Sequence, residues 1–381
     1  MSESPTSKPT ILFAQVNSFS YTNDALLREL GPHLPNHAIE AIRVYPIIRK
    51  NLFLLGLCYL GVVFAYGFRA AFDRKTLTEK IIKTPIFFGL ASYIVRNKAR
   101  NTPNLVAILQ TQGLFNAKVD GVPLVIYTDN TILNRMNRAI DPEHGNVPIL
   151  KQERKLYKSA DKILVCAEHV VTSLRNDYGI DSRSIENVRI GANSPAPASC
   201  AADRYRSGNI LFVGIDWERK GGPALLSAFK RLREQRPDAR LIIAGCNPDI
   251  ANVQGVIALG RIAPTQIAAL LGEAAIFCLP SRVEPFGIAV IEAARAGLPT
   301  VGTAVGGMID SIVDEKTGIL VPVDDVDALE AALGRLLADP DLCEKMGTAA
   351  REWAKEFEWA SVALRISRAL TMRSRHQGDR A

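Results

Sequence analysis

The sequence lacks several patterns that would assign it to common functional classes. Its six cysteines form no Cys-x-x-Cys pair and its five histidines are scattered, so no metal-ligand cluster is expected. No G-x-G-x-x-G motif follows the first predicted strand, which disfavours an NAD-linked oxidoreductase. There is no zinc-finger spacing and no basic–aromatic array, so a nucleic-acid partner is not expected. The polar N-terminus MSESPTSKPT has no apolar signal core, and export is not expected either.

The composition is that of a folded globular protein with more than one domain. The chain has 381 residues, of which 48% are hydrophobic and 22% charged. A single core rarely serves more than about 250–300 residues, so two domains are expected. The net charge of +7 favours phosphate-rich partners such as a nucleotide or an anionic lipid. Cysteines 166, 246 and 278 lie in or beside apolar runs, which predicts buried thiols in a reducing, cytoplasmic compartment.

Short apolar runs alternate with helical patterns along both halves of the chain. This alternation predicts an α/β fold with parallel sheets. Ligands of such sheets bind at the carboxyl ends of the strands. The expected strands are residues 10–16, 39–44, 105–110, 123–127, 162–167, 185–190, 209–213, 240–244, 256–259, 275–279 and 298–302.

The stretch from Pro280 to Asp310 carries the most informative pattern, with a loop at 281–287 and a helix at 288–296. Helices are expected to begin after Gly287 and after Gly306-Gly307, and unpaired amides at helix N-termini suit a phosphate. Two carboxylates frame the first loop. Glu284 stands on it, and Glu292 lies inside an otherwise apolar helix. A carboxylate buried there needs a partner, and sugar hydroxyls would serve.

The run EPFGIAVIE, from Glu284 to Glu292, resembles the E-x7-E signature of retaining glycosyltransferases of family 4, which have the GT-B fold. The likeness is specific over residues 209–330, where VGG and TGILVPVDD also match, and weaker over 105–195. It implies two doubly wound Rossmann-like domains facing a cleft. It also implies transfer of a sugar, with retention, from a nucleoside-diphosphate-sugar donor to a hydroxyl acceptor in polysaccharide or glycoconjugate synthesis. No cofactor and no metal are implied.

Arg219 and Lys220 precede a glycine-rich helix start, where they form either a diphosphate clamp or a solvated basic loop. The resemblance favours the clamp, at least for Lys220. It further implies that Glu292 holds ribose hydroxyls, that Glu284 is catalytic beside the donor sugar, and that the backbone at Ile262 meets the nucleobase. The remaining donor-binding positions that it implies are Phe286, Gly287, Ile288, Gly306 and Gly307.

The chain departs from the family pattern in three places. Ile215 follows Gly214 where many members have an arginine, and the loop 17–23 has no glycine. The TQ…YTD pattern of residues 111–129 is similar to one branch of the family, but no histidine stands near Asp129. Asp129 is therefore a catalytic candidate with an alternative interpretation as a turn or helix-cap aspartate.

Residues 52–68, LFLLGLCYLGVVFAYGF, form an uncharged apolar segment with Arg49-Lys50 on one side and Arg69 on the other. Three alternatives remain open: a buried helix of the first domain, shallow membrane contact, or a membrane span, which needs about 17–25 residues. A span would split the first α/β domain. We predict a peripheral protein that contacts the inner face of an anionic membrane, with an acceptor that can be lipid-linked.

The expected domains are an acceptor-side domain at 1–195, a linker at 196–208 and a nucleotide-sugar domain at 209–355. A C-terminal helix at 356–381 is expected to cross back to the first domain. The alternative function is a non-catalytic, membrane-associated nucleotide-sugar-binding scaffold of the same fold.

Overall fold

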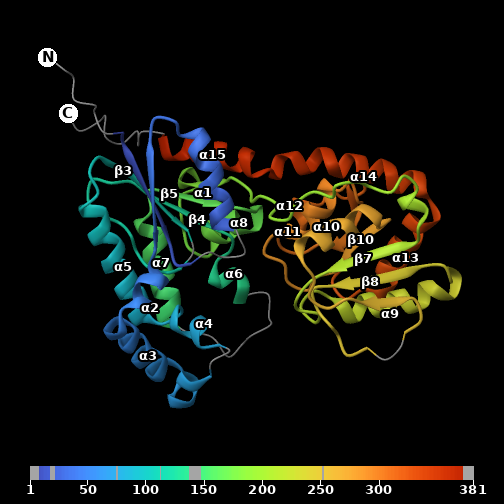
Figure 1. Cartoon of the computed structure of the whole chain (residues 1–381), viewed down its shortest axis with the longest axis horizontal. Helices are drawn as coiled ribbons and strands as arrows, with labels where there is room; N and C mark the ends of the chain where they lie inside the picture. Colours follow the sequence, from blue (N-terminus) through green and yellow to red (C-terminus); the bar gives the residue numbers. More distant parts are fainter. Residues whose placement is uncertain are drawn as a thin grey trace. The chain divides into compact units, whose positions relative to one another are not determined.

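The chain folds into two compact units, which we describe from a computed structural model covering residues 8–17, 22–73, 76–111, 113–136, 147–250 and 253–371 (Figure 1). Unit 1 comprises Met1–Val188 and Val362–Ala381, and unit 2 comprises Arg189–Ser361. The segment 196–208 therefore lies in unit 2. The domain boundaries expected from the sequence, including the part of 356–381 beyond residue 371, remain predictions.

Unit 1 is built on a six-stranded sheet with the strand order β2-β1-β3-β4-β5-β6. All of its pairings are parallel. Its strands are β1 (Thr10–Gln15), β2 (Ala38–Arg43), β3 (Leu105–Thr111), β4 (Leu124–Thr128), β5 (Lys162–Val165) and β6 (Ile185–Asn187). Its helices are α1 (Thr22–His33), α2 (Val44–Lys50), α3 (Leu52–Tyr66), η1 (Phe68–Phe72), α4 (Leu77–Ile81), α5 (Pro85–Arg100), α6 (Ile132–Met136), α7 (Val147–Ser159), α8 (Glu168–Asn176), η3 (Ser182–Ser184) and most of α15 (Trp359–Thr371).

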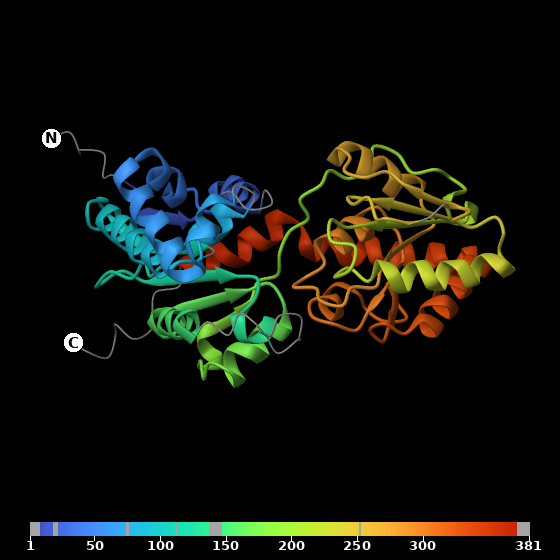
Figure 2. The ribbon, with the colours of Figure 1, turned by 90° about the horizontal axis from the view of Figure 1, so that it is seen from below.

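Unit 2 repeats the plan with the strand order β12-β11-β10-β7-β8-β9, again all parallel. Figure 2 shows helices on both faces of this sheet. Its strands are β7 (Asn209–Val213), β8 (Arg240–Ala244), β9 (Val256–Ala258), β10 (Ile276–Leu279), β11 (Thr300–Thr303) and β12 (Gly318–Val321). Its helices are η4 (Arg204–Arg206), α9 (Gly222–Gln235), α10 (Pro264–Glu273), α11 (Ile288–Arg295), α12 (Met308–Ser311), α13 (Val326–Ala338), α14 (Pro340–Ala354) and η5 (Lys355–Phe357).

These two units confirm the expected class of two doubly wound, Rossmann-like domains. The central strands are apolar on both faces because helices cover both sides of each sheet. Ile210, Leu211 and Phe212 of β7 and Phe277 of β10 have no exposed surface. All six cysteines are free thiols, and burial raises the pKa of Cys278 well above its usual value. Cys166 and Cys278 are buried as predicted, whereas Cys246 is only partly buried.

The C-terminal stretch is helical, as expected, but it is interrupted between Ala354 and Trp359. Helix α14 ends at Ala354, η5 follows, and α15 begins at Trp359 after an extended Glu358. The break has a local cause, because the Ala192 amide donates to the carbonyl of Phe357 at 3.2 Å. A carbonyl used in this way belongs to a turn rather than to a helix interior.

The apolar segment 52–68 forms helix α3 and the start of η1. The Asn51 side chain caps α3 by accepting hydrogen bonds from the amides of Phe53 and Leu54, both at 3.1 Å. Within the described residues, no single helix is long and apolar enough to cross a membrane. Helices α2 and α3 reach that length and composition only together, and they meet at a bend of 106°.

Candidate functional site

The loop between β10 and α11 is the centre of the candidate site in unit 2. Strand β10 ends at Leu279, and Ser281 directly beyond it is buried. Gly287 is the N-cap of α11 with φ of 93°, a left-handed conformation that glycine adopts without steric cost. Helix α11 begins at Ile288, as the sequence predicted. The loop therefore enters α11 through a glycine that leaves the first helical amides open to a ligand.

Two other segments are in close contact with this loop. At Gly221, the N-cap of α9, an added Cβ would lie 1.8 Å from the carbonyl oxygen of Pro280, so only glycine fits there. The Arg282 amide donates to the carbonyl of Arg219 at 2.9 Å. The start of α9 and the end of β10 are thus fixed against each other by backbone contacts.

The segment before α12 closes the other side of the loop. The Gly307 amide donates to the carbonyl of Glu284 at 3.1 Å, and an added Cβ on Gly307 would meet Phe286 Cα at 2.4 Å. The Ser311 hydroxyl donates to the carbonyls of Phe286 and Gly307, both at 2.6 Å. Gly306 has φ of 55°. The predicted donor-binding glycines 287, 306 and 307 therefore lie around a single loop.

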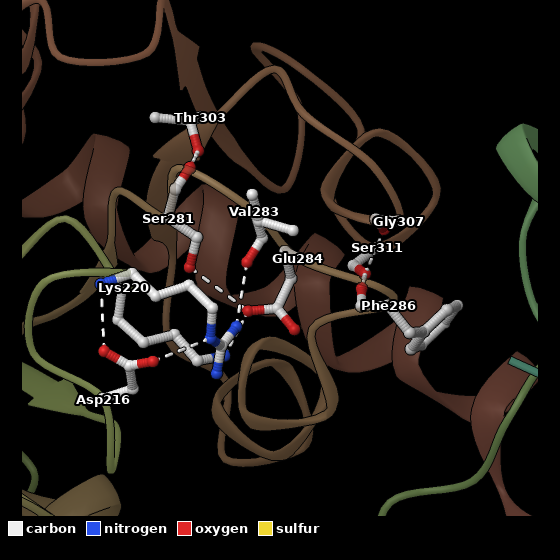
Figure 3. Close-up of polar contacts among 10 residues, drawn as sticks. Asp216, Lys220, Ser281, Val283, Glu284, Phe286, Thr303, Gly307 and Ser311 are labelled. Carbon is white, nitrogen blue, oxygen red and sulfur yellow. Dashed lines mark hydrogen bonds and ion pairs between the residues drawn. The ribbon is translucent and has the colours of Figure 1, made fainter. Parts of the chain in front are cut away.

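Lys220 and Glu284 form an ion pair at the centre of the site (Figure 3). Their side chains are 14% and 7% exposed, so the pair is largely withdrawn from water. The Ser281 hydroxyl also donates to Glu284, at 3.2 Å. A buried carboxylate costs folding free energy unless it is paired and hydrogen-bonded, and both requirements are met here. The clamp lysine and the catalytic carboxylate of the sequence prediction are each other's partners in this structure.

Arg219 lies at the edge of this cluster. Its guanidinium binds Asp216 at 3.2 Å and donates to the carbonyl of Val283 at 2.9 Å. Val283 directly precedes Glu284, so Arg219 ties the start of α9 to the loop that carries the carboxylate. In this arrangement Arg219 positions the loop.

Glu292 has backbone partners. Its Oε1 accepts hydrogen bonds from the amides of Asn193 at 3.2 Å and Ser194 at 2.8 Å. Arg295, one turn further along α11, donates to the carbonyl of Ser194 at 3.0 Å. The indole of Trp359 donates to the Asn193 side chain at 3.1 Å. The carboxylate is therefore held by a segment close to the point where the chain enters unit 2.

The remaining predicted residues are placed less centrally. Phe286 is buried, its ring directed away from the Lys220–Glu284 pair and packed on Phe357 at 5.6 Å between ring centroids (Figure 3). Ile288 is the half-buried first residue of α11, and Ile262 is half-buried between β9 and α10. Asp129 belongs to unit 1, where it is exposed just beyond β4, at the carboxyl end of that sheet.

Sequence reasoning missed several groups that shape the site. Ser281 was read only as the start of a loop, although a hydroxyl three residues before a loop carboxylate can reach it. The amides of Asn193 and Ser194 lie about one hundred residues before Glu292, and nothing in the local pattern indicates them. Ser311 lies at the end of α12, whereas the sequence prediction for this helix concerns only its start. The short spacing between Ser281 and Glu284 could have predicted their contact. Contacts between segments far apart in the sequence could not be predicted in this way.

Chemically, the cluster is suited to an anion. Helices α9 and α11 begin beside it, and their N-termini carry partial positive charge. Lys220 supplies a full charge within the same region, and Glu284 now neutralises it. An entering phosphate could replace Glu284 as the partner of Lys220 and free the carboxylate for a neutral hydroxylated group.

The chain is similar to known proteins both in sequence and in fold. Residues 206–353 match the sequence profile of the family described as glycosyl transferases group 1. Glycogen synthase of Mycobacterium tuberculosis is 31% identical over 224 residues, which are 55% of this chain and 54% of that protein. A GDP-mannose-dependent alpha-(1-6)-phosphatidylinositol monomannoside mannosyltransferase of Mycolicibacterium smegmatis is 29% identical over 58% of this chain and 64% of its own length. The chain thus spans between half and two thirds of these relatives.

The fold extends the likeness to almost the whole chain. The sucrose-phosphate synthase structure from Thermosynechococcus elongatus superposes with a TM-score of 0.69 at 20% identity. It covers 95% of this chain, and this chain covers 98% of it. Residues 206–353, which lie in unit 2 together with the candidate site, match the glycosyl transferases group 1 profile, and the structural likeness shows the fold of both units.

Proposed function

We propose that the protein is a retaining glycosyltransferase that moves a sugar from a nucleoside-diphosphate-sugar donor to a hydroxyl acceptor. The observation that carries the proposal is the convergence of Lys220, Glu284 and the N-termini of α9 and α11 at one edge of the unit 2 sheet. These groups offer both a cation for a diphosphate and a carboxylate for a sugar.

The diphosphate is the leaving group of this reaction and gains negative charge as the bond to the sugar breaks. Lys220 and the amides near Gly287 and Gly306 would stabilise that charge without a metal, because they are already fixed by the folded chain. The Gly307 amide instead holds the carbonyl of Glu284. Before the donor binds, Glu284 balances the charge of Lys220. Donor binding would exchange one partner for the other, so the buried lysine is never left unpaired.

The two carboxylates would divide the donor between them. Glu284 would hold the sugar near its reacting carbon. Glu292 keeps Oε1 on the amides of Asn193 and Ser194 and would use its other oxygen for ribose hydroxyls. Asp129 of unit 1 enters the proposal as a second catalytic candidate, because it lies at the carboxyl end of its sheet, where ligands of such folds bind. Phe286, Ile288 and the backbone at Ile262 would complete the donor site.

The acceptor would be a hydroxyl of a glycan, a glycolipid or a small molecule. One relative is named for a phosphatidylinositol-linked acceptor, which supports the lipid-linked class. We include peripheral contact of residues 52–68 with a membrane in the proposal, on its cytoplasmic side, since all six cysteines are free thiols.

Donor-binding and transfer assays with Lys220→Ala test the proposal. Loss of one contact to a charged group is worth about 1.5–3 kcal/mol, so donor affinity should fall roughly tenfold or more and transfer should slow. Lys230→Ala is the matched control, since Lys230 lies exposed further along α9 and should change neither quantity. Unchanged affinity and rate in a folded Lys220→Ala protein would refute the clamp.

The non-catalytic scaffold gives a different result in the same assays. It would bind nucleotide sugars, with the same dependence on Lys220, but would release no nucleoside diphosphate in the presence or absence of acceptors. Slow donor hydrolysis by the wild type, abolished in Lys220→Ala, would exclude it.

A further inference from the structure

Helix α3 and η1 place large apolar side chains on the surface of unit 1. Figure 1 shows α3 at the lower edge of this unit, beyond α2. Phe53 is 74% exposed and Phe64 is 83% exposed, so neither side chain is packed in a core. We call the following six exposed side chains the apolar platform: Leu52, Phe53, Leu60, Phe64, Phe68 and Phe72.

The platform is one face of a docked helix. Phe53, Leu60 and Phe64 are spaced by seven and four residues, so they share one side of α3. The opposite side is packed, because Cys58 and Val62 have no exposed surface. An added Cβ on Gly61 would lie 3.2 Å from Ile86 Cβ, so α3 and the start of α5 are in close contact. The packed side of α3 therefore fixes the helix to unit 1, so that its other side faces outward.

Two more exposed apolar side chains follow directly after the end of α3. The Phe68 and Phe72 rings of η1 contact each other at 5.0 Å between centroids, and both residues are about 70% exposed. Several large apolar side chains exposed on one short stretch of a folded unit are typical of a binding surface. Phenylalanine and leucine at such a site are typical of helices that lie in a membrane interface.

The charges around the platform favour an anionic partner. Arg49, Lys50 and Arg69 are exposed, and none of them forms an ion pair with another described residue. The nearby acids are already neutralised, since Asp73 pairs with Lys80 at 3.2 Å and Glu79 pairs with Lys83 at 2.6 Å. The rim of the platform is therefore positive. A second copy of this chain would present the same positive rim and be repelled, whereas anionic lipid headgroups would be attracted.

We infer that the apolar platform inserts into the headgroup region of an anionic membrane leaflet, with Arg49, Lys50 and Arg69 on lipid phosphates. This inference deepens the membrane contact included in the proposed function by naming the surface and the lipid class. Insertion is shallow: α3 has 15 residues, which rise about 22 Å, less than the roughly 30 Å hydrocarbon core. The bend of 106° before α3 also suits a helix that lies along a surface.

Sedimentation with vesicles tests the inference. The wild type should bind vesicles of phosphatidylcholine mixed with phosphatidylglycerol, bind pure phosphatidylcholine far less, and be partly released by high salt. The variant Phe53→Ser/Leu60→Ser/Phe64→Ser should lose at least about tenfold in vesicle affinity. Replacing Arg49, Lys50 and Arg69 with alanine should cost about fivefold for each charge on the anionic vesicles.

A matched control removes as many exposed apolar residues from scattered positions. Val106→Ser/Ile257→Ser/Leu364→Ser should leave vesicle binding unchanged, because these residues lie on three separate elements. Donor affinity and far-ultraviolet circular dichroism should be unchanged in the platform variant. Lys220→Ala should sediment with vesicles like the wild type, so failure of the donor site and failure of the platform are distinguishable.

Three results would overturn the inference. Vesicle binding that survives in the platform variant would mean that the platform does not contact lipid. A wild type that is dimeric, with a monomeric platform variant and no vesicle binding, would identify a second copy as the occupant. Wild type that neither salt nor carbonate releases from membranes would mean that the segment spans the bilayer.

Discussion

Helices α3 and α11 are both rich in apolar residues, yet the structure treats them in opposite ways. In α11, Val290, Ile291, Ala293 and Ala294 are buried in unit 2 against the sheet and α14. In α3, only Cys58, Gly61 and Val62 of fifteen residues are buried. Apolar composition therefore does not decide burial. The neighbouring elements decide it. Helix α11 connects the adjacent strands β10 and β11, whereas α3 lies in the insertion between β2 and β3 and packs mainly on α2, α4, α5 and η1.

The difference also separates two kinds of function. Because α11 is buried, its first turn is rigid and can hold a carboxylate and open amides in fixed positions around a small ligand. Because α3 is exposed, its face can adapt to a soft and extended partner. In our proposals, α11 contributes to sugar transfer and α3 holds the protein at a membrane.

The largest effect is expected from a substitution that compares the two helices directly. Ile291→Ser places a hydroxyl and a cavity at a buried position of α11 and should lower the free energy of unfolding by about 3–5 kcal/mol. Phe64→Ser, on a side chain that is 83% exposed, should change it by less than about 0.5 kcal/mol.

Each unit needs its own probe in this experiment. The three tryptophans, Trp217, Trp353 and Trp359, all lie in unit 2, so their fluorescence follows the unfolding of Ile291→Ser. Hydrogen exchange at the amides of unit 1 reports on the stability of that unit in Phe64→Ser. A severe loss of stability in Phe64→Ser would show that α3 is a core helix, and the comparison would fail.

The sequence was sufficient for much of this picture. It placed the helix at 288–296, where the structure has Ile288–Arg295, and it placed β7 and β8 at the residues observed. It could not give the pairing of Lys220 with Glu284, because that contact joins residues 64 positions apart through the packing of β7 beside β10. For Glu292 the sequence predicted a need for a partner but not that Asn193 and Ser194 supply one.

The sequence also did not predict which side of α3 is exposed. A segment that is apolar on all sides is compatible with a core, a membrane interface or a span, and the prediction of peripheral membrane contact does not exclude the other two. The choice depends on which elements cover the helix. That depends in turn on the order of strands and helices in unit 1, which local periodicity does not encode. The structure shows α3 covered on one side only.

A second and smaller effect is expected from the two carboxylates at the buried helix. Glu284→Gln should lower turnover by roughly a hundredfold, because it removes a charge placed beside the reacting sugar and leaves Lys220 without its anionic partner. Glu292→Gln should instead raise the donor KM by roughly tenfold with less change in kcat, since a ribose contact is shared by ground and transition states. Steady-state kinetics with varied donor separates the two.

The reverse pattern, with Glu292→Gln affecting kcat and Glu284→Gln affecting KM, would show that the division of roles is wrong. Glu273→Gln is a suitable control, because Glu273 is an exposed carboxylate at the end of α10 in the same unit. It should leave both kinetic constants unchanged.

The smallest effect, none at all, is expected from removing divalent metal ions. In the proposal, the charge that develops on the leaving diphosphate is met by Lys220 and by the amides at the start of α11, and these groups remain in place when EDTA is added. Among the described residues, no group of three His, Cys, Asp or Glu side chains is placed to hold a metal ion. The initial rate of transfer should therefore be the same with EDTA, with added Mg²⁺ and with added Mn²⁺. Loss of activity on chelation, restored by one of these ions, would mean that the buried helix end needs a metal beside it. The protein groups alone would then not complete the donor site. With the metal bound, Lys220→Ala should lower donor affinity by less than the roughly tenfold expected for the clamp.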